Sequence, residues 1–241
     1  MAELPLSEQV AVITGASQGI GRAVGEELSR MGARVMLAAR NVSRLAEVAA
    51  GLKRAGGVAE FCATDLRSQQ QVTALIETTL RRFERVDILV NNAGIGHFGT
   101  PLHLTPPEVW DATWETNLRG IYFALRAVVP TMIERRGGHI INIASLAAHN
   151  PLPGAAIYAA SKAALHQLSV SVAEELRGYG IRVSLVCPGS VDTDLSPELV
   201  GNKDRGKMLR PEDVAHVVAM LVTQGPRSFV SEVQMRPTQK P

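Results

Sequence analysis

Two hydrophobic patterns alternate along nearly the whole sequence. Short runs rich in β-branched residues alternate with segments that place apolar residues at helical spacing. Several runs, such as 86–90, are apolar almost throughout, which is typical of parallel strands covered on both faces. This alternation predicts an α/β fold with a doubly wound sheet and helices on both faces. The expected strands are Val10–Thr14, Arg34–Ala38, Val58–Thr64, Ile88–Asn91, His139–Ala144, Arg182–Cys187 and Phe229–Met235. The expected helices are Gly19–Met31, Ser43–Ala55, Ser68–Phe83, Pro106–Arg136, Ala155–Gly178 and Pro211–Thr223.

The bulk properties indicate one ordinary globular domain spanning residues 1–241. Hydrophobic residues make up 46% of the chain and charged residues 20%, and no linker or internal repeat divides it. A formal charge of +2 without a basic cluster argues against nucleic-acid binding. No apolar run is long enough for a bilayer and no signal peptide is evident, so we expect a cytoplasmic protein without a membrane partner. Cys62 and Cys187 lie far apart and no metal-binding motif is present, so we expect reduced, packed thiols and no metal.

The least regular stretch of the sequence is 189–208. It contains Pro197, Gly201 and Gly206 and shows neither of the two periodic patterns. Long irregular segments inside compact domains are usually functional. We therefore predict a flexible substrate flap over a binding site.

A glycine-rich turn follows the first expected strand. The strand Val10–Thr14 runs into Gly15-Ala16-Ser17-Gln18-Gly19-Ile20-Gly21 and then into a helix. Such a turn lets phosphate oxygens approach the backbone, and the helix N-terminus offers unpaired N–H groups. No Gly-Lys-Ser/Thr follows, so it is not a P-loop. The turn predicts a dinucleotide cradle, although a tight turn that merely needs glycine remains an alternative.

The end of the second strand indicates which dinucleotide is bound. An acidic residue there would accept hydrogen bonds from the adenosine ribose, but this chain has Ala39 followed by Arg40 and Asn41. A guanidinium suits a 2′-phosphate, so the pair favours NADP(H) over NAD(H). Arg40 could instead be a solvated surface charge. Asp65 after the third strand could contact the adenine amino group, or could be a turn carboxylate.

Tyr158 stands four residues before Lys162 in an expected helix. Residues at this spacing share one helical face, so both side chains can point into one pocket. A neighbouring ammonium and the charge of an oxidised nicotinamide should lower the pKa of the tyrosine toward a useful range. Ser145, at the end of His139–Ala144, could donate a hydrogen bond to a substrate oxygen. Each residue also has an ordinary structural interpretation: Ser145 as a helix cap, Tyr158 as a core aromatic, and Lys162 as a solvated residue.

Together these residues resemble the short-chain dehydrogenase/reductase family, in its single-domain branch of about 250 residues. The resemblance extends from about Gln9 to Met235. It is carried by Thr14-Gly15-x-x-x-Gly19-x-Gly21, Asn91-Asn92-Ala93-Gly94, Ser145, Tyr158-x-x-x-Lys162 and Pro188-Gly189-Ser190-Val191-Asp192-Thr193.

The resemblance implies a three-layer Rossmann fold with a seven-stranded parallel sheet. It implies a catalytic set of Asn117, Ser145, Tyr158 and Lys162, in which Asn117 holds a water that links Lys162 to solvent. Asn117 could instead satisfy backbone groups at a helix kink. It also implies a homotetramer or homodimer built on Pro106–Arg136 and Ala155–Gly178. With the turn and strand-end residues, the expected NADP(H) contacts are Gly15, Ser17, Gln18, Gly19, Ile20, Gly21, Arg40, Asn41, Asp65, Leu66, Asn92, Ala93, Gly94, Tyr158, Lys162, Pro188, Gly189, Val191 and Thr193.

Two departures from the family pattern matter. Many NADP(H)-using relatives carry a basic residue where this chain has Gln18, so recognition of the 2′-phosphate would rest mainly on Arg40. The chain ends in 229–238 without the Asp-Gly-Gly segment of many relatives. This ending resembles the subgroup that reduces small hydroxy-acid and aldehyde substrates, and it weakens an assignment to fatty-acid synthesis.

The substrate contacts are the least constrained part of the sequence. We expect 146–154 and 190–208 to wall the pocket. His97 is a further polar candidate that could equally be solvated, while Trp110 and Trp114 share a helical face and are favoured as core or subunit packing. The candidate substrate residues are Leu146, His149, Leu152 and Ser190.

The residues favour one function and leave two alternatives open. The favoured function is an NADPH-dependent enzyme that reversibly reduces a small ketone or aldehyde, with Tyr158 as the proton donor and acceptor. A 3-oxoacyl-acyl-carrier-protein reductase would need a basic patch at the pocket mouth, and the sequence cannot place Arg119 and Arg126 there. A non-catalytic NADP(H)-sensing protein is disfavoured because the Asn-Ser-Tyr-Lys set is complete.

Overall fold

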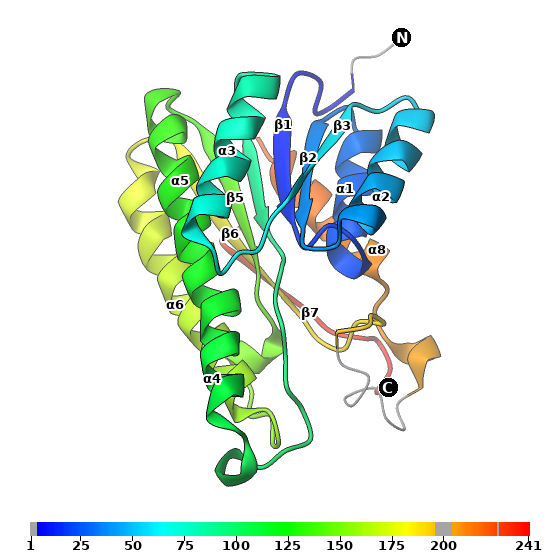
Figure 1. Ribbon diagram of the computed structural model, residues 1–241, viewed down its shortest axis with the longest axis vertical. Helices are drawn as coiled ribbons and strands as arrows, with labels where there is room; N and C mark the ends of the chain where they lie inside the picture. The colour runs from blue at the N-terminus through cyan, green and yellow to red at the C-terminus, as the bar shows by residue number, and fades with distance from the viewer. Residues whose placement is uncertain (1–3, 196–203, 226) are drawn as a thin grey trace.

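Seven parallel strands form one sheet in the computed structural model, which describes residues 4–195, 204–225 and 227–241 (Figure 1). The strand order is β3-β2-β1-β4-β5-β6-β7. The seven-stranded doubly wound sheet predicted from the sequence is therefore confirmed. The strands are β1 (Val10–Thr14), β2 (Arg34–Ala39), β3 (Ala59–Ala63), β4 (Ile88–Asn91), β5 (Gly138–Ile143), β6 (Ile181–Pro188) and β7 (Glu232–Met235).

Helices cover both faces of the sheet, as Figure 1 shows. Alternate residues of each strand point to opposite faces, so Ala11 and Ile13 pack under α1, α2 and α8, whereas Val10 and Val12 pack under α3, α5 and α6. Both clusters are buried, which explains why the strand sequences are apolar almost throughout. The helices are α1 (Gly19–Arg30), α2 (Val42–Arg54), α3 (Gln69–Phe83), α4 (Pro107–Trp114), α5 (Gly120–Glu134), α6 (Ala156–Arg177) and α8 (Pro211–Val222).

The strand order reverses between β1 and β4. β1 pairs in parallel with β2 on one side and with β4 on the other, so the chain leaves their carboxyl ends in opposite directions. In open α/β sheets, ligands bind in the crevice at such a switch point. The glycine-rich turn after β1 and the segment after β4 both open onto this crevice. None of the helices in the described part of the chain is long and apolar enough to cross a membrane.

The expected helix over Pro106–Arg136 is interrupted. The structure places a π-helical turn, Glu115–Arg119, between α4 and α5. Such wide turns insert an extra residue into an α-helix and are frequent at functional sites. Here the turn contains the buried Asn117, whose side chain bonds to Ile95 rather than to its own helix. The sequence pattern could not show this, because the apolar spacing on either side stays helical.

The last strand is shorter than the sequence pattern suggested. We expected Phe229–Met235, but β7 begins only at Glu232. Before it, the Ser184 hydroxyl donates to the Val230 carbonyl, at 2.6 Å, in place of a regular ladder bond. The β-rich composition of 229–231 therefore continues as an irregular segment beside β6.

Candidate active site

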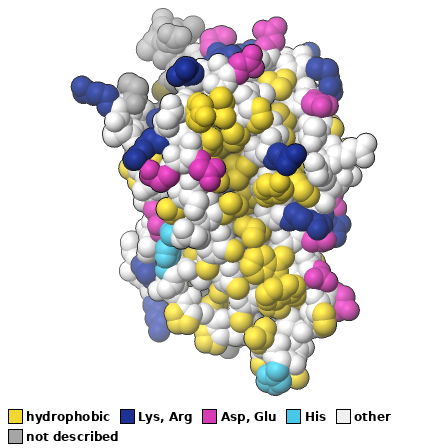
Figure 2. Space-filling model, turned by 90° about the vertical axis from the view of Figure 1, so that its left-hand side faces the viewer, with side chains coloured by type: hydrophobic (Ala, Val, Ile, Leu, Met, Phe, Trp, Pro, Cys, Tyr) yellow, Lys and Arg dark blue, Asp and Glu magenta, His cyan; other side chains and the backbone are white. Residues whose placement is uncertain are grey.

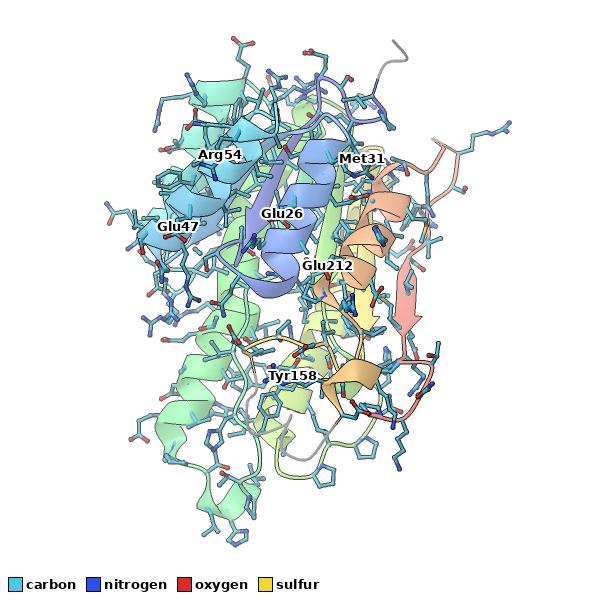
Figure 3. All side chains as sticks on the ribbon, turned by 90° about the vertical axis from the view of Figure 1, so that its right-hand side faces the viewer. Glu26, Met31, Glu47, Arg54, Tyr158 and Glu212 are labelled. Atoms are coloured by element: carbon cyan, nitrogen blue, oxygen red, sulfur yellow. The ribbon has the colours of Figure 1, made fainter. Side chains whose placement is uncertain are left out.

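A cavity of about 870 Å³ opens at the carboxyl ends of the strands, beside the switch point. It extends from Arg40 after β2 to Ser145 after β5 and Tyr158 on α6. In Figure 3, Tyr158 lies below the end of the sheet to which the strands point. Most of the residues expected to bind the cofactor line this one cavity, as do Ser145, Tyr158 and Lys162 of the expected catalytic set.

Hydrogen bonds fasten the glycine-rich turn to the segment after β4. The Thr14 hydroxyl oxygen accepts from the backbone N–H of Asn92, at 3.0 Å, and of Ala93, at 3.2 Å. The Asn92 amide donates in return to the Thr14 carbonyl, at 3.0 Å, and to the Gly15 carbonyl, at 3.3 Å. Gly15 and Gly19 both have positive φ, of 66° and 53°. The turn is therefore a preformed part of the cavity wall.

Gly21 has a packing role rather than the expected cofactor contact. It does not line the cavity. A Cβ added there would lie 2.4 Å from the Gly15 carbonyl oxygen and 2.5 Å from the Asn92 amide nitrogen. The third glycine of the motif thus lets α1 start directly against the turn, which corrects our assignment.

A second guanidinium, that of Arg44, donates a hydrogen bond to Gln18, which lines the cavity. Arg40 lines the cavity and forms no hydrogen bond or ion pair with the described residues. Arg44 was not among the expected cofactor contacts, and it does not itself line the cavity. The Asn41 side chain caps α2, since its Oδ1 accepts from the Arg44 N–H at 3.0 Å.

Asp65 and Leu66 lie at the same end of the cavity after β3. The Asp65 carboxylate pairs with Arg67 at 2.6 Å and accepts the Arg67 backbone N–H at 3.0 Å. The hydrogen bond from the Arg67 guanidinium holds the Asp65 pKa below its usual value. Asp65 is therefore a turn carboxylate that also lines the cavity, while Leu66 is buried against Gly120.

Tyr158 and Lys162 lie together at the inner end of the cavity, as their spacing predicted. Both are buried, and the Lys162 ammonium lies 5.8 Å from the centroid of the Tyr158 ring. Burial lowers the pKa of Lys162 to about 8. Burial raises the pKa of Tyr158, and a hydrogen bond with the Ser145 side chain opposes this only in part.

That direction for Tyr158 is opposite to the one we expected for the complete site. We expected the neighbouring ammonium, together with the charge of an oxidised nicotinamide, to lower the tyrosine pKa. In the structure the Lys162 Nζ donates to the Ile143 carbonyl at 2.9 Å, and desolvation of the phenolate is the largest influence on the Tyr158 pKa. The tyrosine is therefore held in its protonated form when the chain is alone.

Ser145 and Asn117 support the same corner of the site. The Ser145 Oγ accepts the Ala147 N–H at 3.1 Å and so caps the short helix 146–148, while its side chain also meets Tyr158. Asn117 bridges two segments: its amide donates to the Ile95 carbonyl at 2.8 Å and to the Ser161 hydroxyl at 3.0 Å. A water bound by Asn117 stays a prediction.

The candidate substrate residues divide into two groups. Leu146, Leu152 and Ser190 line the cavity beside Ser145. His149 does not: its Nε2 lies 2.7 Å from a Glu232 carboxylate oxygen on β7, which turns the ring away from the cavity. His97 is likewise engaged elsewhere, with its Nε2 3.0 Å from the Thr100 hydroxyl. Neither histidine is therefore retained as a candidate substrate contact.

Two parts of the wall were not foreseen from the sequence. The Phe98 ring packs on the Tyr158 ring, with centroids 5.1 Å apart. The last residues of the chain fold back over the cavity and bring two basic side chains to it. No local pattern marked either feature. The tail residues that line the cavity are Arg236, Pro237, Gln239, Lys240 and Pro241.

The expected flap is only partly described. Residues 196–203 lie outside the described part of the chain, so its mobility stays a prediction. Two contacts join the residues before this gap to those after it: Asp192 pairs with Arg205 at 3.0 Å, and Val191 forms a β-bridge with Leu209. The described ends of the segment thus hold each other at the cavity edge.

The basic residues considered for a carrier-protein surface lie elsewhere. Arg119 pairs with Glu115 at 2.7 Å, and Arg126 donates to the Tyr122 hydroxyl at 3.2 Å. Neither lines the cavity. Trp110 and Trp114 stack with centroids 5.1 Å apart, also outside it. Ligand stacking on these indoles is therefore not supported.

A model of the short chain dehydrogenase family matches residues 9–204. The chain belongs to the short-chain dehydrogenase family and is an oxidoreductase. It is 38% identical over 235 residues to an uncharacterised oxidoreductase of Staphylococcus saprophyticus, covering 96% of this chain and 98% of the relative.

Two solved structures of this dehydrogenase family extend the comparison. A metagenomic short-chain oxidoreductase in complex with NADP is 47% identical, with a TM-score of 0.86, covering 98% of this chain and 100% of the other. The 3-ketoacyl-(acyl-carrier-protein) reductase of Brucella melitensis, complexed with NADH, is 31% identical, with a TM-score of 0.88 and coverage of 96% and 97%.

Proposed function

We propose that this dehydrogenase uses NADPH to reduce a small ketone or aldehyde, reversibly, with Tyr158 as proton donor and acceptor. One observation carries the proposal. A buried Tyr158, with Ser145 against it and Lys162 one turn away, ends a cavity whose other end is lined by Arg40.

The cavity residues fit NADP(H). The backbone of 15–19 and the start of α1 can receive the pyrophosphate, because the turn is held open by positive φ at Gly15 and Gly19. Arg40, with Arg44 bonded to Gln18 on the cavity wall, can pair with a 2′-phosphate. The metagenomic neighbour, at 47% identity, has NADP bound. When bound, NADPH supplies the hydride.

The chain's own residues handle the proton and the carbonyl oxygen. Burial keeps the Tyr158 hydroxyl protonated, which suits a group that must donate a proton during reduction. Ser145 faces the same space and can stabilise negative charge on the substrate oxygen. Lys162, with its pKa near 8, can return a proton to the tyrosine at physiological pH. Asn117 positions the loop at Ile95 against α6.

The test measures NADPH and NADH oxidation against a panel of carbonyls. The panel holds β-keto esters, simple aldehydes, diketones and a 3-oxoacyl thioester, with Tyr158→Phe as the blank. We expect NADPH-dependent turnover of a small carbonyl that disappears in the variant. Tight NADPH binding with no turnover of any panel carbonyl would instead leave a narrow substrate outside the panel or a sensing role.

A 3-oxoacyl-acyl-carrier-protein reductase is the second candidate. The Brucella melitensis neighbour with this activity, at 31% identity, supports it. Against it, Arg119 is already paired with Glu115 and neither this residue nor Arg126 is at the cavity mouth. A thioester turned over with a much higher kcat/KM than the small carbonyls would decide for this candidate.

A homodimer or homotetramer is supported by the surface of α4, α5 and α6. Figure 2 shows apolar side chains gathered down this side of the molecule, and Trp110, Tyr122 and Val170 are between 42% and 46% exposed. Exposed apolar patches of this kind usually mark interfaces. Light scattering should give a dimer or tetramer, and a monomer in Tyr122→Glu; a monomeric wild type would contradict the interface. The cytoplasmic location stays a prediction.

A further inference from the structure

Three side chains from separate segments converge behind the wall of the active-site cavity. The Glu232 carboxylate on β7 holds both imidazoles: its Oε1 lies 2.7 Å from the His149 Nε2 and its Oε2 lies 3.0 Å from the His166 Nε2. The two rings meet edge to face with centroids 4.6 Å apart. His149 follows the short helix 146–148, and His166 lies on α6. One carboxylate thus gathers two nitrogen donors.

A thiol completes this group. Cys187 lies on β6 and is fully buried; its register partner on β7 is Gln234, two residues after Glu232, so the Cys187 and Glu232 side chains share one face of the sheet. Its sulfur, a nitrogen of His149 and an oxygen of Glu232 lie within 4.8 Å of one another. In the described part of the chain, these residues form the group of donors close enough to share a metal ion.

We propose that His149, His166, Glu232 and Cys187 form a binding site for a zinc-class divalent metal ion. Two imidazole nitrogens, one carboxylate oxygen and one thiolate sulfur match the ligands that Zn²⁺ takes in tetrahedral sites. Calcium and magnesium prefer oxygen alone, so this donor set disfavours them.

The distances require only small movements. Zinc–ligand bonds of about 2.0–2.3 Å place tetrahedral ligands roughly 3.3–3.8 Å apart. The histidine–carboxylate pairs, at 2.7 and 3.0 Å, would open slightly, and the sulfur, within 4.8 Å of donor atoms of His149 and Glu232, would close in. His166 pairs with Glu232 but falls outside that group of three, so its nitrogen would have to approach the other donors. The Gln234 amide donates to the Glu232 Oε1 at 3.2 Å and orients the carboxylate from outside. The His149 side chain is 29% exposed, which leaves a path for the ion to enter.

Metal binding releases the Cys187 proton, and the charges of the filled site then balance. The Cys187 S–H loses its proton to solvent when the Zn–S bond forms, and each imidazole binds through Nε2 in its neutral form with its proton on Nδ1. The ionised Glu232 contributes the second negative charge. The filled site is electrically neutral, because one thiolate and one carboxylate balance Zn²⁺, and this favours a partly buried position.

The ion would connect segments that also build the active site. The helix 146–148 begins directly after Ser145, and α6 carries Tyr158 and Lys162. β6 and β7 lead into Pro188 and the C-terminal tail, which line the cavity. The proposal does not depend on the substrate or cofactor, since its evidence is the donor group itself.

Cobalt titration of the chelator-treated, full-length chain tests the site. We expect about one equivalent of Co²⁺ to give visible bands typical of tetrahedral coordination and a near-ultraviolet thiolate-to-cobalt band, both removed by adding Zn²⁺. Cys187→Ser should lose the thiolate band. His149→Gln and Glu232→Gln should weaken Co²⁺ binding at least about tenfold, the lower end of losses seen even for outer partners of metal ligands.

Matched variants and a second measurement keep the outcome decisive. Cys62→Ser and His216→Gln remove a cysteine and a histidine outside the group, and they should leave spectrum and affinity unchanged. Zinc should also raise the melting temperature of the wild type but not of His149→Gln. A wild-type chain with no tetrahedral cobalt spectrum and no zinc-dependent rise in melting temperature would overturn the proposal, as would a thiolate band that survives in Cys187→Ser.

Discussion

The two ends of the active-site cavity are built in different ways. The dinucleotide end comes from short stretches directly after β1, β2 and β4, tied together by Thr14 and Asn92. The substrate end is assembled from the helix 146–148, the segment after β6 and the C-terminal tail, which are far apart in the sequence. The first end is a property of local backbone geometry. The substrate end depends on how segments far apart in the sequence pack together.

The largest effect should separate chemistry from cofactor binding. Tyr158→Phe removes the hydroxyl that we propose carries the proton but keeps the ring that packs on Phe98. We expect kcat to fall by roughly 10²–10⁴, the usual contribution of a general acid. The dissociation constant for NADPH, measured by fluorescence titration, should stay within about twofold. Retained turnover with lost NADPH affinity would mean that Tyr158 serves cofactor binding rather than proton transfer.

The next effect should show how rigid the dinucleotide end is. In Gly21→Ala the new methyl group meets the Gly15 carbonyl and the Asn92 amide, so the turn must move. Overpacking of this kind costs about 1–3 kcal/mol in the free energy of unfolding, and NADPH binding should weaken with it. Gly137→Ala is the control, because no atom lies within 4 Å of its added Cβ. Equal stability of the two variants in denaturant would mean that the turn is adaptable.

The choice of dinucleotide should depend on a single loop. Ala39→Asp combined with Arg40→Leu adds a partner for the ribose hydroxyls and removes the guanidinium from the cavity. Because a charge-assisted hydrogen bond contributes about 1.5–3 kcal/mol, the ratio of kcat/KM for NADPH over NADH should fall roughly tenfold to a hundredfold. The panel substrates should keep their rank order. An unchanged ratio would indicate that Arg44, rather than Arg40, recognises the 2′-phosphate.

A separate effect, on stability alone, concerns a buried histidine at the opposite end of β5. Burial lowers the pKa of His139 to about 3, so the folded protein binds fewer protons than the unfolded chain between about pH 6.5 and pH 3. The free energy of unfolding should therefore decrease as the pH is lowered through this window, with a slope of up to about 1.4 kcal/mol per pH unit. Urea titrations should give a flatter profile for His139→Asn. The same slope in both proteins would assign the acid sensitivity to other groups.

Much of the fold was predictable because its signals are local. The alternation of β-branched runs and helical spacing gave seven strands close to their observed bounds, and the i, i+4 spacing brought Tyr158 and Lys162 to one pocket. The glycine-rich turn opened onto the cavity as expected. Gly21 was misassigned because a motif shows where a glycine is needed without showing whether a ligand or the backbone of Gly15 lies against it.

The errors at the substrate end arose from contacts across the sheet. His149 was expected at the cavity, but Glu232 on β7 holds it, and 83 residues separate the two. No pattern within the sequence connects them. The same holds for the tail that lines the cavity and for the π-helical turn around Asn117, whose partner Ile95 belongs to another segment.

The sequence by itself determined the layers of the fold, the glycine-rich turn at the cavity and the pairing of Tyr158 with Lys162. These depend on periodicity and on spacings of a few residues, which backbone geometry converts directly into position. Only the tertiary structure decided the direction in which the Tyr158 pKa shifts, the pairing of His149 with Glu232 and the residues that line the substrate end. Desolvation and long-range pairing set these properties, and both depend on what packs around a side chain once distant segments have come together.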